Sequence, residues 1–185
     1  MAATPSTMMP LGTIAPSFQL LDTVSGKTLS LAELKGEKAT LVMFICNHCP
    51  YVLHINDELV QMAKGYQPKG VSFIAISSND VENYPQDGPE LMKIHAKKLG
   101  YQFPYLYDES QEVAKAYEAA CTPDLFLFDH ELKCVYRGQL DDSRPNSDIP
   151  VTGRDLRSAL EAFLSGQEIS DEQIPSIGCN IKWKQ

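Results

Sequence analysis

Short apolar runs alternate with amphipathic segments along most of this chain. Residues 39–45 and 71–77 form continuous runs rich in β-branched and aromatic side chains, a pattern typical of buried strands. Between them, residues 50–64 carry apolar side chains at helical spacing and are followed by Gly65, which predicts a helix and its end. A strand, helix, strand order predicts parallel strands joined by a crossover helix.

Shorter elements are expected on both sides of this unit. Residues 17–21 and 27–29 flank the turn-forming pair Ser25-Gly26, which predicts an N-terminal β-hairpin. Further helices are expected at residues 90–99, 112–120 and 155–164, a short strand at 105–107, and a late hairpin from 125–128 and 133–136. The sequence therefore predicts an α/β fold, with a mixed central sheet flanked by helices and followed by a C-terminal tail.

Composition indicates an ordinary globular chain. Its 185 residues are 43% hydrophobic and 22% charged, and we expect a single domain over residues 1–185, with a core at about 12–164 and a tail at 165–185. A net charge of −8 argues against nucleic acid or an anionic membrane surface as partner. Residues 1–12 have neither a basic segment nor a sustained apolar run, so a cytoplasmic location is expected.

The candidate chemistry lies between the first buried run and the helix that follows it. Cys46-Asn47-His48-Cys49 occupies this corner, directly before Pro50. A helix N-terminus favours a thiolate, and two thiols at this spacing suit thiol–disulfide exchange. We expect Cys46 to be exposed and to attack, and Cys49 to resolve the mixed disulfide. The odd count of five cysteines argues against a static disulfide framework.

The residues beside the two cysteines are expected to tune them. Asn47, His48 and Pro50 are assigned this role because they lie between or next to the thiols. An imidazolium at His48 would lower the pKa of Cys46 below the free value of about 8.5. The alternative is that His48 points into solvent, where its charge is screened.

The stretch that begins APSFQLLDTVSGKTL at Ala15 resembles the opening of the alkyl hydroperoxide reductase/thiol-specific antioxidant family. The span 12–164 is similar to a thioredoxin-like fold, and the nearest resemblance is to a peroxiredoxin-like branch that carries CxxC. This resemblance implies that Thr122-Pro123 contains a cis-proline that faces the cysteines and binds substrate backbone. The alternative is an ordinary trans-proline that opens a strand.

The chain departs from its relatives at positions that decide the chemistry. Cys49 can be placed on the peroxidatic cysteine of the peroxiredoxins. Cys46 then occupies the position of the family's Thr or Ser, Val42 that of its upstream Pro, and Pro123 that of its Arg. These replacements favour dithiol exchange over peroxide reduction. The buried carboxylate of thioredoxin would be Thr40 here, so that proton acceptor is missing. The Xaa-His pair resembles that of oxidising thioredoxin-like proteins, which implies a potential less negative than thioredoxin's value of about −270 mV.

The other cysteines remain open between redox and structural roles. Cys121 could lie near the active pair, although a small buried thiol is the alternative. Cys179 resembles the C-terminal resolving cysteine of some peroxiredoxins, in a tail apolar enough to dock. Cys134 lies within a strand pattern and is expected to be core.

We therefore predict a thiol–disulfide oxidoreductase without a cofactor. Its expected partners are protein or small-molecule disulfides and thiols, with a cellular thiol reductant. One alternative is an atypical peroxiredoxin-like thiol peroxidase, because an accessible thiolate can be oxidised by peroxide. Another is a copper-binding thioredoxin-fold module that uses the Cys pair with His54 or His130. The chain has only one CxxC pair and no second pair of Cys or His ligands, which argues against a metal. Arg137 and Arg144 are candidate substrate contacts, with surface charge as the alternative.

Overall fold

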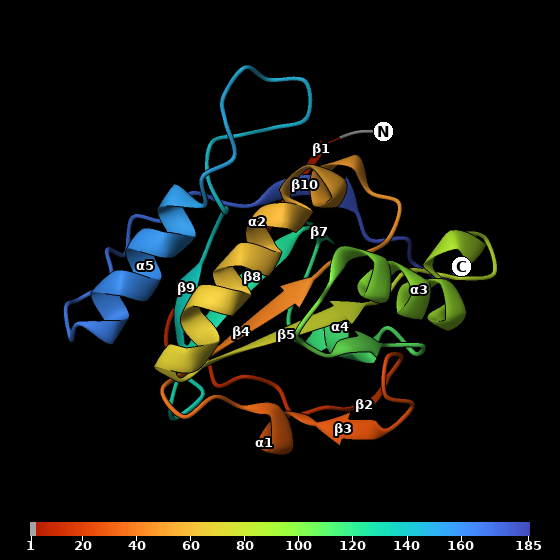
Figure 1. Ribbon diagram of the computed structural model, residues 1–185, viewed down its shortest axis with the longest axis horizontal. Coiled ribbons are helices and arrows are strands. Elements are labelled where there is room, and N and C mark those ends of the chain that lie inside the picture. Colours follow the sequence, from red (N-terminus) through yellow and green to blue (C-terminus); the bar gives the residue numbers. More distant parts are fainter. Residues whose placement is uncertain (1–2) are drawn as a thin grey trace.

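The computed structural model describes residues 3–185, and a seven-stranded mixed sheet forms its centre (Figure 1). The strand order is β3-β2-β6-β5-β4-β8-β9. β4 pairs in parallel with β5, and β5 with β6, whereas β8 and β9 run antiparallel. Their bounds are β2 Gln19–Asp22, β3 Thr28–Ser30, β4 Ala39–Phe44, β5 Val71–Ser77, β6 Tyr105–Tyr107, β8 Asp124–Asp129 and β9 Cys134–Arg137. The expected mixed sheet and N-terminal hairpin are confirmed.

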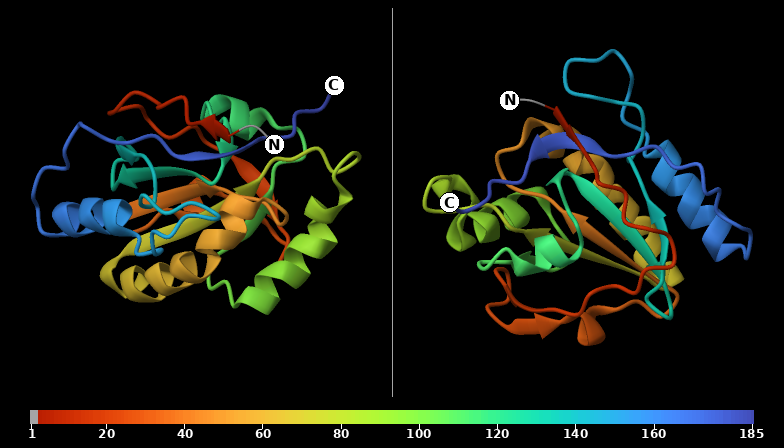
Figure 2. Two further views of the ribbon diagram at one scale, coloured as in Figure 1. Left: turned by 90° about the horizontal axis from the view of Figure 1, so that it is seen from above. Right: turned by 180° about the vertical axis from the view of Figure 1, so that it is seen from behind.

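Helices cover both faces of this sheet, as the two views of Figure 2 show. The helices are α1 Leu31–Leu34, α2 Pro50–Tyr66, α3 Pro89–Leu99, α4 Glu112–Ala116 and α5 Arg154–Leu164, with 3₁₀ turns η1 Gln67–Lys69 and η2 Pro85–Asp87. α2, α3 and α5 lie on one face, and α4 lies with the N-terminal segment on the other. Alternate β4 side chains enter the two apolar layers, Leu41 and Met43 on the α2 side and Val42 and Phe44 on the α4 side. Burial on both faces explains why β4 is continuously apolar.

Residues at the ends of the helices determine where several of them begin and end. Ser30 and Glu33 form the reciprocal capping box that begins α1, and Pro50 occupies the first turn of α2. The helix expected at 112–120 is shorter than predicted. It ends at Ala116 because Glu118 takes a positive φ of 54°, which no right-handed helix continues.

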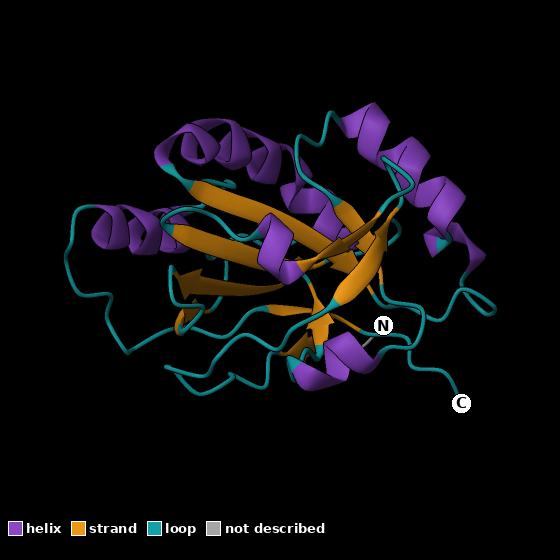
Figure 3. Ribbon diagram, turned by 90° about the horizontal axis from the view of Figure 1, so that it is seen from below, coloured by secondary structure: helices purple, strands orange, loops and turns teal. Residues whose placement is uncertain are grey.

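A second sheet of three strands was not expected. β10 (Ile177–Asn180) lies between β1 (Ala3–Pro5) and β7 (Cys121–Thr122), antiparallel to both. Figure 1 labels these short strands near the N-terminus, and Figure 3 shows the strands in orange with helices on either side of them. The C-terminal tail thus docks beside the segment that precedes β8. Within residues 3–185, no helix is both long and apolar enough to cross a membrane.

Candidate redox site

Cys46 and Cys49 lie where β4 gives way to α2. Cys49 is the N-cap residue of α2, and Cys46 lies in the preceding loop. Their exposed fractions are 1% for Cys46 and 0% for Cys49. The expectation of an exposed Cys46 is therefore wrong, because the loop lies beneath residues from β7 and η2.

Thr122 contacts both sulfur atoms. Its Oγ1 lies 3.6 Å from Cys46 Sγ, and its carbonyl oxygen accepts a hydrogen bond of 3.1 Å from Cys49 Sγ. The peptide bond between Thr122 and Pro123 is cis. This contact follows from strand register, since Phe44 of β4 pairs with Asp124 of β8. The residues that follow Phe44 and precede Asp124 therefore meet at one end of the sheet.

The two thiols have different surroundings. Interaction with Cys49, burial and the nearby carboxylate of Asp87 raise the pKa of Cys46 above its ordinary value. Interaction with Cys46 lowers the pKa of Cys49, although burial opposes this shift. The direction at Cys46 is opposite to the lowered pKa expected from the sequence, because Cys49, burial and the Asp87 carboxylate all disfavour its thiolate.

Asp87 is the functional candidate that sequence reasoning missed. Its carboxylate is fully buried and lies 2.6 Å from His48 Nδ1. It also accepts hydrogen bonds of 2.8 Å from the backbone N–H of Asn47 and from Asn79 Nδ2. The His48 ring stacks on Tyr84 at 5.7 Å between centroids. The available signal was its position in the polar loop after β5, because loops at the carboxyl ends of parallel strands gather at one edge.

Further hydrogen bonds fix Asn47, in the loop between the cysteines. Tyr105 donates a hydrogen bond of 3.0 Å to Asn47 Oδ1, and Asn47 Nδ2 donates one of 2.8 Å to the Gln86 carbonyl. His48 Nδ1 lies 4.0 Å from Cys46 Sγ, so His48 does not point freely into solvent. Thr40, on β4, accepts a hydrogen bond from the backbone N–H of Gly36.

Two of the three other cysteines lie near this site. Cys179 of β10 is the register partner of Thr122, and its thiol interacts with Cys49. Cys121 is the neighbour of Thr122 on β7, with its Sγ 3.4 Å from the Pro123 carbonyl oxygen. Cys134 packs in the apolar layer on the opposite face of the sheet. Burial raises the pKa values of Cys121, Cys134 and Cys179, the last to about 12.

The two arginines fix loops in the structure. Arg137 donates to the Met9 carbonyl and to Gln173 Oε1. Arg144 donates to the carbonyl oxygens of Asp141 and Ser143. Both guanidinium groups therefore hold loop segments together, and Arg144 also lines the pocket described next.

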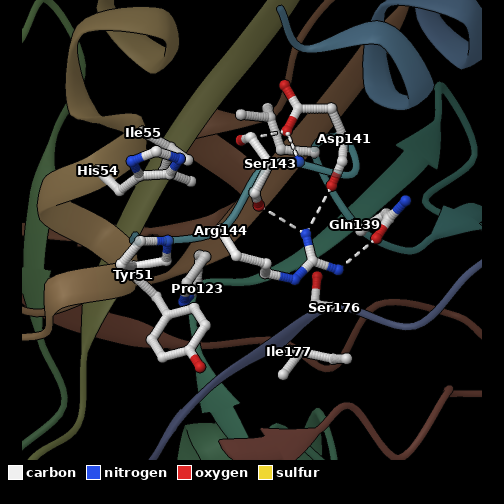
Figure 4. A pocket seen from close by; sticks show the side chains of 12 residues that line it. Tyr51, His54, Ile55, Pro123, Gln139, Asp141, Ser143, Arg144, Ser176 and Ile177 are labelled. Carbon is white, nitrogen blue, oxygen red and sulfur yellow. Dashed lines mark hydrogen bonds between the residues drawn. The ribbon is translucent and has the colours of Figure 1, made fainter. Parts of the chain in front are cut away.

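A pocket opens beside Pro123 (Figure 4). The N-terminal part of α2 forms one wall with Tyr51 and His54, and the Arg144 side chain lies across from it. Ile177, at the start of β10, closes a further side. Because Pro123 directly follows the residue that touches both thiols, this pocket is the candidate binding site for a substrate segment next to the redox pair.

The sequence pattern of the AhpC/TSA family matches residues 11–137. The chain belongs to the AhpC/TSA family. This match spans the N-terminal hairpin, the cysteine corner and the cis-proline, and it ends with β9. No curated protein matches the chain.

Solved structures extend the AhpC/TSA comparison to the whole chain. An uncharacterised conserved protein from Geobacillus kaustophilus is 61% identical with a TM-score of 0.98, covering 100% of this chain and 97% of its own. A hypothetical protein from Sinorhizobium meliloti is 49% identical with a TM-score of 0.95, covering 98% of each chain. The thioredoxin domain of a thiol-disulfide oxidoreductase from Bacteroides vulgatus is 22% identical with a TM-score of 0.66, covering 85% of this chain and 99% of that domain. The last of these shows the fold alone, which is thioredoxin-like as expected.

Proposed function

We propose that this protein is a thiol–disulfide oxidoreductase in which Cys46 attacks the substrate and Cys49 resolves the mixed disulfide. The observation that carries the proposal is the contact of Thr122, directly before the cis-proline, with both sulfur atoms at the N-terminus of α2. Membership of the AhpC/TSA family supports the coarser assignment of thioredoxin-like redox chemistry.

The proposed exchange proceeds in two steps. In the reduced pair, the Cys49 thiol donates to the Thr122 carbonyl oxygen. As Cys46 gives up its proton and attacks one sulfur of a substrate disulfide, the second substrate sulfur leaves and takes up a proton. Cys49 then loses its proton and attacks the Cys46 sulfur. The Cys46–Cys49 disulfide forms, and the remaining substrate sulfur leaves as a thiol.

Neighbouring residues hold this pair and receive the substrate. Asp87 orients His48 and the backbone at Asn47 through the hydrogen bonds described above, so these residues position the cysteine loop. The pocket at Pro123, with Tyr51 and Ile177 on its walls and a cavity volume of about 20 Å³, marks the surface at which a substrate segment would contact the cis-proline. We expect a cellular thiol to reduce the protein afterwards.

Single-cysteine variants test this assignment. Cys46→Ser should exchange with a disulfide-containing peptide much more slowly than wild type, and Cys49→Ser should accumulate a stable mixed disulfide on Cys46, detected by mass spectrometry of the intact protein. Cys134→Ser, which removes a buried cysteine from the opposite face of the sheet, is the matched control and should exchange normally. Normal exchange by Cys46→Ser would refute the role of Cys46.

A thiol peroxidase activity is the second candidate. It is favoured by the lowered pKa of Cys49 at the start of α2, the position that corresponds to the peroxidatic cysteine in the family alignment above. A peroxidoxin from Mycobacterium tuberculosis has a similar fold, with 17% sequence identity and a TM-score of 0.64. At this identity the similarity shows the fold and not the activity. Rapid peroxide consumption with a sulfenate on Cys49 would favour this candidate, whereas slow consumption would favour dithiol exchange.

Metal binding also has one observation in its favour. The donor atoms of Cys46, His48 and Asp87 lie within 4.8 Å of one another. A thiol and an imidazole suit a soft or borderline metal, although His54 and His130, the histidines proposed from sequence, lie outside this group. Copper binding that is lost in His48→Ala and retained in His130→Ala would support the metal-binding candidate.

A further inference from the structure

The C-terminal strand brings a third thiol to the redox pair. β10 pairs antiparallel with β7, and its Cys179 lies directly opposite Thr122. Opposite residues of an antiparallel pair project from the same face, with Cβ atoms about 4.5–5.5 Å apart. The Thr122 side chain points toward Cys46, with 3.6 Å between Oγ1 and Sγ, so the Cys179 side chain projects toward the same site.

Contacts to Cys49 agree with this strand register. The Thr122 carbonyl lies 3.1 Å from Cys49 Sγ, and the Cys179 thiol itself interacts with the Cys49 thiol. Cys46, Cys49 and Cys179 also share one apolar layer. Cys179 is 3% exposed, and the thiol with which it interacts is that of Cys49.

The position of β10 is built into the sequence at Gly178. A Cβ at this residue would overlap the backbone carbonyl of Thr122. Glycine therefore permits the close approach of β10 to the segment before Pro123. Close approach at Gly178 sets Cys179, the next residue, against the redox pair.

Cys121 is placed differently from Cys179. It is adjacent to Thr122 on β7, and successive strand residues point to opposite faces. Its Sγ lies 3.4 Å from the Pro123 carbonyl oxygen and 4.0 Å from that of Ser176. Cys121 is thus held by backbone carbonyls beside the site, and Cys179 is the thiol that meets Cys49.

We propose that Cys179 is a third exchanging thiol, which attacks Cys49 within the Cys46–Cys49 disulfide and converts it into a Cys49–Cys179 disulfide. This inference rests on the proposed dithiol exchange. The Cys179–Cys49 bond forms as the Cys46–Cys49 bond breaks, and the proton of Cys179 passes to the departing Cys46 sulfur. One disulfide and one thiol are present before and after the step, so it needs no oxidant or reductant.

The isomerisation has a defined consequence for the site. It returns Cys46 as a free thiol beside Thr122 while the two oxidising equivalents remain stored between Cys49 and Cys179. It also links β10 covalently to the start of α2. When the reverse step restores the Cys46–Cys49 disulfide, a thiol substrate can attack Cys46 and form a mixed disulfide with it.

Disulfide mapping in glutathione buffers tests the inference on the full chain. Wild-type protein should contain both bridges, in a ratio that stays constant as the glutathione ratio varies, because the isomerisation consumes no electrons. Cys46→Ser, and Cys46→Ala as a second variant, should form Cys49–Cys179. The double variant Cys46→Ser/Cys179→Ser should instead carry glutathione on Cys49. Cys46→Ser/Cys134→Ser is the matched control and should retain the bridge.

The outcomes separate this inference from the proposed function. Folding of each variant is checked by far-ultraviolet circular dichroism before oxidation. A wild-type Cys46–Cys49 bridge together with glutathione on Cys49 and a free Cys179 thiol in folded Cys46→Ser would overturn the third-thiol role alone. Failure of wild-type protein to form Cys46–Cys49 under any glutathione ratio would overturn the proposed function. A bridge between Cys49 and Cys121 in Cys46→Ser would also contradict the inference.

Discussion

At the scale of single residues, one buried carboxylate contributes to the charge around the cysteines. Interaction with Cys49 and burial raise the pKa of Cys46, and Asp87, which contacts His48, raises it further. The sequence predicted a cationic neighbour for Cys46, but Asp87 lies beyond β5 in the chain and its contact depends on how the loops meet. A pattern of local spacing could therefore identify the thiols and the histidine without identifying the carboxylate that binds it.

Removal of that charge should make Cys46 more reactive. In Asp87→Asn the pKa of Cys46 should fall, and each pKa unit corresponds to about a tenfold change in the thiolate-to-thiol ratio. The measurement is the alkylation rate of Cys46 between pH 6 and 9, read by peptide mass spectrometry. Asp57→Asn, on the exposed side of α2, should react like wild type. An unchanged or slower rate in folded Asp87→Asn would contradict the role assigned to Asp87.

A second buried carboxylate should make stability depend on pH. Asp124 follows Pro123, and burial raises its pKa to about 6. Its Oδ1 has no hydrogen-bond partner within residues 3–185. Because the folded pKa exceeds the unfolded value of about 3.9, the protonated form favours folding. That stability is fully present below about pH 4 and is lost as pH rises through 6.

Asp124→Asn should remove this pH dependence. The free energy of unfolding of wild type, measured in urea, should fall relative to the variant between pH 4 and 7, by about 1.4 kcal/mol for each pKa unit. Asp57→Asn, an exposed change on α2, serves as the control for a general charge effect. Parallel pH profiles for wild type and Asp124→Asn would show that Asp124 ionises as it does in the unfolded chain.

At the scale of elements, the sequence predicted regular structure well where the local pattern was strong. The strand expected at 71–77 is β5, and the helix expected from Pro50 is α2. β5 is buried within the central sheet and one face of α2 packs on it, so both elements carry apolar side chains in a pattern that can be recognised in a single sequence. The fold and the two-cysteine corner were therefore predictable from residues in β4, α2 and their neighbours.

The strands of the small sheet carry no such pattern. β10 contains Gly178 and a polar Asn180, and β1 ends in Pro5. Each is short, and each is stabilised by a partner far away in the chain. The third thiol could be suspected from the tail, but its position opposite Thr122 requires a register that only the folded structure gives.

A methyl group at Gly178 should displace this strand. Gly178→Ala places a Cβ against the Thr122 carbonyl, and backbone shifts of this kind cost about 1–3 kcal/mol. Urea unfolding should show that loss, and the oxidised variant should contain less Cys49–Cys179 bridge. Gly65→Ala, inside α2 with open space around it, should be neutral or slightly stabilising. Equal stability of both variants would contradict the close approach of β10.

At the scale of the whole molecule, the fold gathers residues from four separate segments at one end of the sheet. The corner between β4 and α2, together with η2, β7 and β10, supplies Cys46, Cys49, Asp87, Thr122 and Cys179. Family membership shows the class of redox fold, and the site geometry supports dithiol exchange within it.

The most direct test of dithiol exchange is equilibration of the wild-type protein in glutathione buffers, followed by disulfide mapping, with a parallel sample treated with hydrogen peroxide. The account predicts a reversible Cys46–Cys49 disulfide, with a potential less negative than thioredoxin's value of about −270 mV, and slow peroxide consumption. Fast peroxide consumption that ends in a sulfenate on Cys49, without a reversible Cys46–Cys49 disulfide, would contradict it.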